Sequence, residues 1–136
     1  MKETELMIKN WLFCGTKIGQ ITDIFKIKDE EDHLITFSLL TGNIVTTDLK
    51  DIRSIPLTPE ILEKNGFVVN KDREEIWYEI KSGKYGLFGI SRFETTTHWI
   101  IGFTDGTNLI EHLDIHYVHE LQNAMTLCKI EKQIEL

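Results

Sequence analysis

The sequence predicts an α+β fold: an N-terminal SH3-like small β-barrel, a short connector helix, and a second antiparallel sheet packed by a C-terminal helix. Three observations predict it. Residues 6–55 form short runs rich in Ile, Val, Thr and Phe, separated by turn-forming residues. A capped helical segment follows at 56–67, and five further strand-like runs precede a helical apolar stripe at 115–128. The predicted domains are 1–56 and 57–136.

The first half of the chain consists of strand-like runs joined by turns. Four runs make up the predicted barrel: LMIKNWLFC, KIGQITDIFKI, HLITFSLL and NIVTTDL. Gly42 and Asn43 tolerate the positive φ of a tight hairpin turn. In QITDIFKI the apolar residues do not alternate cleanly, which predicts a β-bulge or a strong bend near Asp23. The charged KDEEDH run at 28–33 is predicted to be a solvated loop.

The segment PLTPEILEKNGF carries the strongest local signals in the chain. Thr58 can cap a helix, and Pro59 suits the first helical position because its missing N–H is not needed there. Gly66 can take the left-handed conformation that ends a helix. Leu57 and Leu62 have the spacing of a hydrophobic staple. We therefore predict a short two-turn helix that is fixed at both ends.

The second half has five more strand-like runs: FVVN, EIWYEIKS, GLFGISRFE, HWIIGF and NLIEHL. TDGT at 104–107 predicts a hairpin, because Asp-Gly lies between two apolar runs. IWYEI alternates, which places Ile76, Tyr78 and Ile80 on one face of a strand. The helix predicted at 115–128 has apolar residues at spacings of three and four, and we expect it to cover this sheet. These residues are Ile115, Val118, Leu121, Met125 and Cys128.

Composition and charge argue against several classes of protein. With 136 residues, of which 41% are hydrophobic, the chain is too apolar to be disordered. Its net charge of −7 argues against a general nucleic-acid binder, because Lys and Arg supply the affinity for phosphate backbones. No run approaches the roughly 18 apolar residues of a membrane span, and the N-terminus has no signal-peptide pattern. We expect a cytoplasmic protein with no membrane partner, in which Cys14 and Cys128 are free thiols.

The stretch HLDIHYVHELQN places His112, His116 and His119 at spacings of four and three. Two imidazoles on one helix face can bind zinc, but a zinc site needs three or four ligands at about 2.0–2.3 Å. We predict that Asp114 is the N-cap of the helix, which leaves His112 in the preceding strand or turn. The helix then has no obvious third ligand, unless Asp114 or His112 turns toward the other two histidines. A metal-binding protein or metal-dependent enzyme using these three histidines is therefore an alternative function and not the favoured one.

Sequence signatures of catalysis are missing. There is no GxSxG motif, and neither cysteine has a flanking signature of a nucleophile. GKYGLFG has a strand-turn-strand setting, whereas a phosphate-binding loop requires strand-turn-helix. We therefore assign no catalytic, cofactor-binding or metal-binding residues. We expect that the protein is not an enzyme and uses no cofactor.

Six aromatic residues can either fill the cores of the two sheets or form an exposed recognition platform: Trp11, Phe13, Trp77, Tyr78, Tyr85 and Trp99. Core packing is the favoured interpretation, because large aromatic side chains are the main filling of small β domains. The platform is the alternative, since small barrels bind partners through exposed aromatic side chains. The sequence does not say which of the six are exposed.

The stretches ELMIKNWLFCG, IPLTPEILEKNGF and IHYVHELQNAMTL together resemble a family of small uncharacterised proteins of gut Bacteroidetes and their phages and mobile elements. Members carry a LRIGNW-like start, a PLTxEIL..GF segment and a YVHxLQN segment. Lys9 stands where that family often has Gly, and residues 71–110 match no family pattern. His119 is the only one of the three histidines within a family motif. We interpret YVHELQN as a helix docked on the sheet, with His119 and Gln122 bonded to backbone at the sheet edge.

The function that we expect is a noncatalytic protein-binding or adaptor module of phage or mobile-element origin. Its partner is expected to be a protein, and self-association stays open. A weaker alternative is an acidic mimic of nucleic acid that inhibits a host factor. That alternative needs acidic side chains on one face, and the even charge distribution gives no sign of them.

Overall fold

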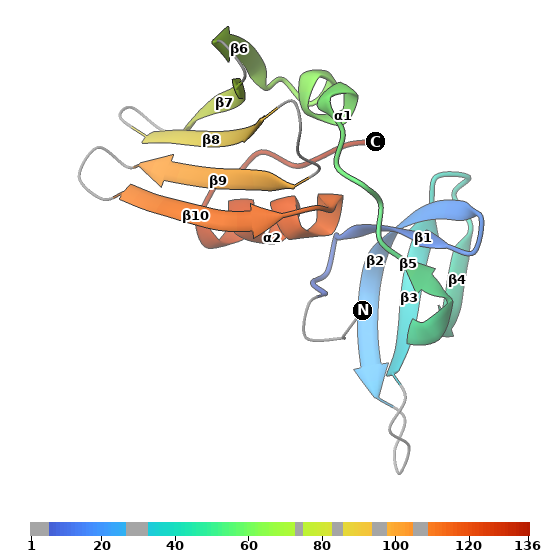
Figure 1. Ribbon diagram of the computed structural model, residues 1–136. Helices are drawn as coiled ribbons and strands as arrows, with labels where there is room; N and C mark the ends of the chain where they lie inside the picture. The colour runs from blue at the N-terminus through green and yellow to red at the C-terminus, as the bar shows by residue number, and fades with distance from the viewer. Residues whose placement is uncertain (1–5, 27–32, 73–74, 83–85, 94–97, 105–108) are drawn as a thin grey trace. The chain divides into compact units, whose positions relative to one another are not determined.

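The computed structural model describes residues 6–26, 33–72, 75–82, 86–93, 98–104 and 109–136 (Figure 1). The fold is α+β, as predicted, with two five-stranded antiparallel sheets and two α-helices within these residues. The chain forms two compact units, which are Met1–Pro56 with Tyr117–Asn123 and Leu57–His116 with Ala124–Leu136. No helix in the described ranges has the length and apolar character needed to cross a membrane.

The first sheet is built from five short strands: β1 (Trp11–Cys14), β2 (Lys17–Lys26), β3 (His33–Leu39), β4 (Ile44–Asp48) and β5 (Ile52–Arg53). Their order is β4-β3-β2-β1-β5, and every neighbouring pair is antiparallel. A 3-10 turn at Leu49–Asp51 brings β5 back to pair with β1. The sheet therefore curls into a half-barrel, which is the SH3-like element predicted from the sequence (Figure 1).

The predicted bulge near Asp23 is confirmed. Ile21 pairs with Phe37 and Asp23 pairs with Thr36, so Thr22 is the extra residue in β2. The Thr22 hydroxyl donates to Thr36 O at 3.2 Å. The extra residue bends β2, as a strongly curved sheet requires.

The predicted TGN hairpin between β3 and β4 is also confirmed. Gly42 has φ 91, and its N–H donates to Leu39 O at 2.9 Å. The Leu39 N–H in turn donates to Asn43 O at 2.8 Å. A glycine is required here because L side chains are strained at this φ. The predicted loop at 28–33 lies outside the described residues, apart from His33 at the start of β3.

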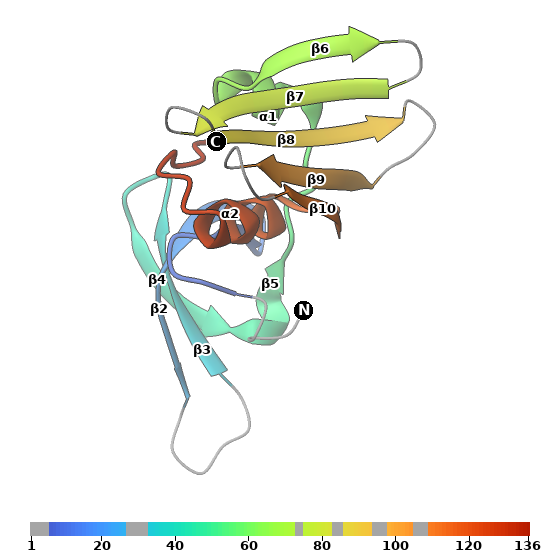
Figure 2. The same cartoon turned by 90° about the vertical axis from the view of Figure 1, so that its left-hand side faces the viewer.

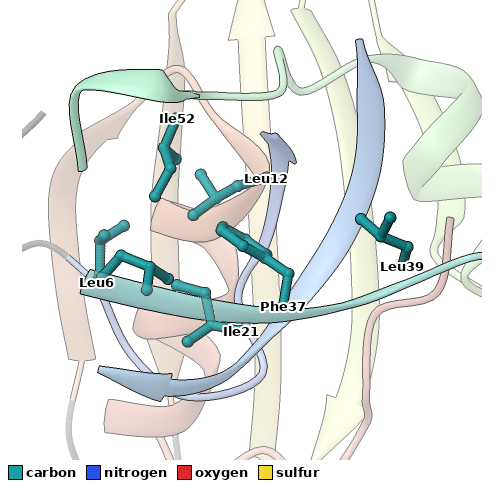
Figure 3. Packing of buried hydrophobic residues seen from close by; sticks show 7 residues of the cluster. Leu6, Leu12, Ile21, Phe37, Leu39 and Ile52 are labelled. Atoms are coloured by element: carbon teal, nitrogen blue, oxygen red, sulfur yellow. The ribbon is translucent and has the colours of Figure 1, made fainter. Parts of the chain in front are cut away.

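The core of the first unit is a cluster of apolar side chains that converge from the strands and the lead segment (Figure 3). Gly19 lies against this cluster, where an added Cβ would meet Leu39 Cδ2 at 3.0 Å and Phe37 Cβ at 3.2 Å. A side chain at that position would therefore require Leu39 or Phe37 to shift by a few tenths of an ångström. The buried members are Leu6, Leu12, Ile21, Ile35, Phe37, Leu39 and Ile52.

The connector helix α1 (Pro59–Lys64) begins and ends as predicted, with a Thr58 cap before it and a left-handed Gly66 after it. The Thr58 side chain accepts a hydrogen bond from an N–H of the first turn at 3.4 Å. Gly66 takes φ 83 just after the helix, and the N–H of Phe67 donates to Leu62 O at 3.1 Å. This bond is part of a Schellman motif, which satisfies carbonyl groups at the helix end.

The second sheet is a meander of five strands: β6 (Val68–Asp72), β7 (Glu75–Ser82), β8 (Gly86–Phe93), β9 (Trp99–Thr104) and β10 (Leu109–Ile115). Each strand pairs antiparallel with the next along the chain (Figure 2). Tyr78 pairs with Ile90, and both are buried on one face. The predicted TDGT turn lies outside the described residues from position 105 on.

The C-terminal helix α2 (Val118–Leu127) begins three residues later than predicted. Asp114 is not its N-cap, because β10 continues through Asp114 to Ile115, which pairs with Trp99. The spacing of Ile115 suits both a helical stripe and a strand, so periodicity alone placed it wrongly. The helix instead begins after Tyr117, whose N–H donates to the Glu120 carboxylate at 3.1 Å.

Candidate functional site

Two of the six aromatic residues lie in the core of the second unit. Tyr78 and Trp99 are almost fully buried, and their rings meet edge to face with centroids 5.8 Å apart. The indole Nε1–H of Trp99 donates to Leu57 O at 3.3 Å, so its polar atom is satisfied. The core interpretation is therefore confirmed for this pair. The side chains of Trp77 and Tyr85 lie outside the described residues.

Trp11 and Phe13 lie on the side of β1 that faces away from the core. Leu12 between them is fully buried in the core of the first unit, and successive side chains of a strand point to opposite faces. Trp11 pairs with Gln20, and Phe13 pairs with Ile18. All four side chains are half-buried. Of the four aromatic residues of this set whose side chains are described, these two are therefore the ones that lie outside a core.

The same face continues across β3 and β4. Gln20 pairs with Ser38, and Ser38 pairs with Ile44, whose side chain is 72% exposed. Leu40, just after β3, is 58% exposed, and its N–H donates to Ile18 O at 3.2 Å. We call this surface the outer face. It comprises Trp11, Phe13, Ile18, Gln20, Ser38, Leu40, Ile44 and Arg53.

Arg53 supplies a positive charge at one edge of the outer face. Its backbone pairs with Phe13, and its guanidinium carbon lies 5.5 Å from the centroid of the Phe13 ring. Its Nη2 donates to Gly15 O at 3.0 Å. Both contacts restrict the rotamers that the Arg53 side chain can adopt.

A set of side-chain amides fixes the segment that leads into β1. Asn10 is 2% exposed; its Nδ2 donates to Asn123 Oδ1 at 2.9 Å, and its Oδ1 accepts from Met7 N–H at 2.8 Å. Gln122 accepts from Trp11 N–H at 2.8 Å and donates to Lys9 O at 2.9 Å. We call the bonds made by Asn10, Gln122 and Asn123 the amide lock.

The amide lock links two sequence stretches that lie near opposite ends of the chain. Asn10 and Trp11 come from ELMIKNWLFCG, and Gln122 and Asn123 come from IHYVHELQNAMTL. Gln122 bonds to backbone, as predicted, but the backbone is that of Lys9 and Trp11 at β1 and not that of a sheet edge. The partnership of Asn10 with Asn123 was missed, because 113 residues separate them and no local pattern connects them. The sequence does show two amide residues, Asn10 and Asn123, beside apolar runs. A buried amide needs a hydrogen-bond partner, so this pattern was the available indication.

The three histidines of HLDIHYVHELQN have different surroundings. His112 lies in β10, in line with the prediction that it precedes the helix, but its side chain is outside the described residues. His116 is exposed, and its ring lies beside His98 with centroids 6.2 Å apart. His119 is buried, and its ring stacks on Tyr117 at 5.9 Å. Among the described residues, no three His, Cys, Asp or Glu side chains are arranged to hold a metal ion.

The two cysteines are free and partly buried. Burial raises the pKa of the Cys14 thiol; Asp51 raises it further and Lys17 lowers it. Burial also raises the pKa of Cys128. Because the thiolate is the nucleophile, a raised pKa makes both groups less reactive at neutral pH.

The outer face combines aromatic and aliphatic side chains with a fixed arginine at its edge. Trp, Tyr and Arg are the residues that most often dominate protein–protein contacts, with apolar centres and polar rims. Strand pairing and burial alone define the outer face. No protein-family model, curated protein or solved structure matches this chain.

Proposed function

We propose that this protein is a noncatalytic protein-binding or adaptor module and that the outer face is its binding surface. The observation that carries the proposal is the exposure of Ile44 and Leu40 on the same sheet face as Trp11 and Phe13. Apolar side chains gathered on one face of a folded domain mark contact sites more often than isolated ones do. A cytoplasmic location and a phage or mobile-element origin belong to the same proposal.

The partner that fits this surface is a protein segment with apolar side chains and at least one carboxylate. The apolar side chains would cover Phe13, Leu40 and Ile44, which removes their surface from water. The carboxylate would pair with Arg53, whose guanidinium is already oriented by Phe13 and Gly15. The chain as a whole carries a net charge of −7, whereas Arg53 places a positive charge at this edge. Pairing with Arg53 would therefore fix how the partner segment is aligned along the outer face.

The test places a photo-crosslinking amino acid at Ile44 in one variant and at Val68 in a second. Val68 is a matched control, because it is 64% exposed and lies on β6 of the other unit. A protein captured from host lysate at Ile44 and not at Val68 is then purified. Its affinity is measured for the wild type, Ile44→Asp and Val68→Asp.

The proposal expects Ile44→Asp to weaken binding at least about tenfold, which is about 1.4 kcal/mol, and Val68→Asp to leave it unchanged. Ile44 is exposed, so the Asp variant should keep the melting temperature of the wild type. Equal effects of the two substitutions, or none from Ile44→Asp, would place the binding surface elsewhere. Reproducible turnover of a substrate would contradict the noncatalytic part.

A further inference from the structure

His98 and His116 lie side by side at one end of the β9–β10 ladder. Trp99 pairs with Ile115 as the last pair of that ladder, and His98 and His116 are the next residues beyond it at the same end. Their ring centroids are 6.2 Å apart and the ring planes are tilted by 56°. The pairing of β9 with β10 thus brings together two imidazoles that are 18 positions apart in the sequence.

Both histidines are on the side of the sheet that faces away from its core. Trp99 and Ile115 are almost fully buried, and the residues next to them in an extended chain point the other way. His98 is half-exposed and His116 is exposed. Asp114, two residues before His116, is exposed on the same side. A small ion from solvent can therefore reach both rings.

Hydrogen bonds hold the backbone of His116 and the neighbour of His98. His116 O accepts from Leu57 N–H at 3.0 Å, and Leu57 O accepts from the indole of Trp99, which follows His98 in the sequence, at 3.3 Å. A ligand whose backbone is already held loses less entropy when a metal binds.

We propose that His98 and His116 form a two-histidine site for a divalent transition-metal ion of the Zn²⁺ or Ni²⁺ class. Imidazole nitrogen is a preferred ligand of both ions. A metal–nitrogen bond of about 2.0–2.1 Å places a ring centroid about 3.2 Å from the ion, so two rings on one ion have centroids about 5–6 Å apart. The observed 6.2 Å lies just beyond that range. A side-chain rotation that moves the rings together by about 1 Å closes the site.

The remaining coordination positions belong to water, because the described residues hold no group of three His, Cys, Asp or Glu arranged around one point. Asp114 is the acidic side chain on the same side of β10 that can accept hydrogen bonds from such waters. This site differs from the one that HLDIHYVHELQN suggested, because His98 from another strand replaces His112 and His119. It is independent of the outer face and of the proposed binding function.

The test is calorimetric titration of the untagged protein with Zn²⁺ and, separately, with Ni²⁺. The expected result is one ion per chain, with affinity lowered at least about tenfold by His98→Gln and by His116→Gln. His33→Gln on β3 and His112→Gln are the controls, and both should bind like the wild type.

A second measurement needs no substitution. Paramagnetic Cu²⁺ added to the wild type should broaden the backbone amide signals around residues 98–100 and 114–116 before any others. Wild type that binds no ion more tightly than about 1 mM would overturn the site. So would binding that survives either substitution at the pair, dependence on His112, or broadening centred elsewhere.

Discussion

At the scale of single residues, Lys9 has a strained backbone conformation that is compensated by hydrogen bonds to residues far from it in the sequence. It has φ 74, a left-handed conformation that costs a non-glycine residue roughly 1–2 kcal/mol. Its backbone nevertheless makes three hydrogen bonds: the N–H donates to Ile21 O, and the carbonyl accepts from Gln20 and Gln122. These bonds hold the left-handed turn ahead of β1.

Lys9→Gly should therefore stabilise the protein. Glycine takes this φ without strain but loses more entropy on folding, so we expect a net gain of about 0.5–1 kcal/mol in the free energy of unfolding. Urea denaturation should show a higher midpoint with an unchanged slope. Lys64→Gly, at the last residue of α1, is the control and should lower the midpoint. A lower midpoint for Lys9→Gly would mean that its side chain makes a larger contribution than its backbone strain removes.

At the scale of elements, the amide lock ties the lead segment of β1 to α2. Asn123→Ala should leave the buried Nδ2 of Asn10 without its acceptor, which costs about 1–3 kcal/mol in the free energy of unfolding. Gln20→Ala is the control, because the hydrogen bond from Gln20 to Lys9 O is exposed and water can replace it. Equal losses from the two variants would contradict this account.

A double-mutant cycle isolates the bond between the two asparagines. The Asn10→Ala, Asn123→Ala double variant should be less destabilised than the two single variants together, with a coupling of about 0.5–3 kcal/mol. Chemical denaturation of the four proteins in one buffer supplies all the values. Additive losses would indicate that each amide acts through other contacts.

Elements with local signals were predictable from the sequence, and elements that depend on distant partners were not. Thr58 and Gly66 fix the ends of α1 through bonds within a few residues, and the bulge near Asp23 disturbs alternation inside its own strand. The start of α2 was predicted wrongly because Ile115 is the strand partner of Trp99, which lies 16 positions earlier in the sequence. Local periodicity does not reveal that pairing.

The same distinction applies to the candidate site. Alternation in β1 predicts that Trp11 and Phe13 share a face, but it does not say whether that face is the core. The answer depends on Leu12, which joins a cluster drawn from three other strands and the lead segment. Tyr78 and Trp99 have the same residue types as the outer-face aromatics and are buried instead. Composition alone therefore could not select the binding surface.

At the scale of the whole molecule, the division of the chain into units does not follow a single cut. Tyr117–Asn123, the start of α2, belongs to the unit that contains the first sheet. Val118 and Leu121 in this segment are fully buried. Val118 N–H also donates to Ile55 O at 2.9 Å, beside the bridge between Pro56 and Tyr117. The first unit is therefore built from two segments that are separated in the sequence by residues 57–116.

This arrangement makes the boundary between 1–56 and 57–136 testable by fragments. A chain of 1–56 alone loses the partners of Asn10, Trp11 and Ile55 O, and each buried polar group left without a partner costs about 1–3 kcal/mol. That loss approaches the whole stability of a small domain, about 5–15 kcal/mol. We expect 1–56 to be unfolded, with poor dispersion in its amide NMR spectrum.

Restoring residues 117–127 should restore the fold. Because Pro56 and Tyr117 form an antiparallel bridge, a glycine-containing linker of about four residues can join them in place of 57–116. The joined chain should give a dispersed spectrum and a cooperative thermal transition, whereas the same chain with Asn123→Ala should melt lower. If 1–56 alone folds as stably as the joined chain, α2 adds nothing to the stability of the first unit. Residues 1–56 would then be an independently folding domain, as the predicted boundary implies.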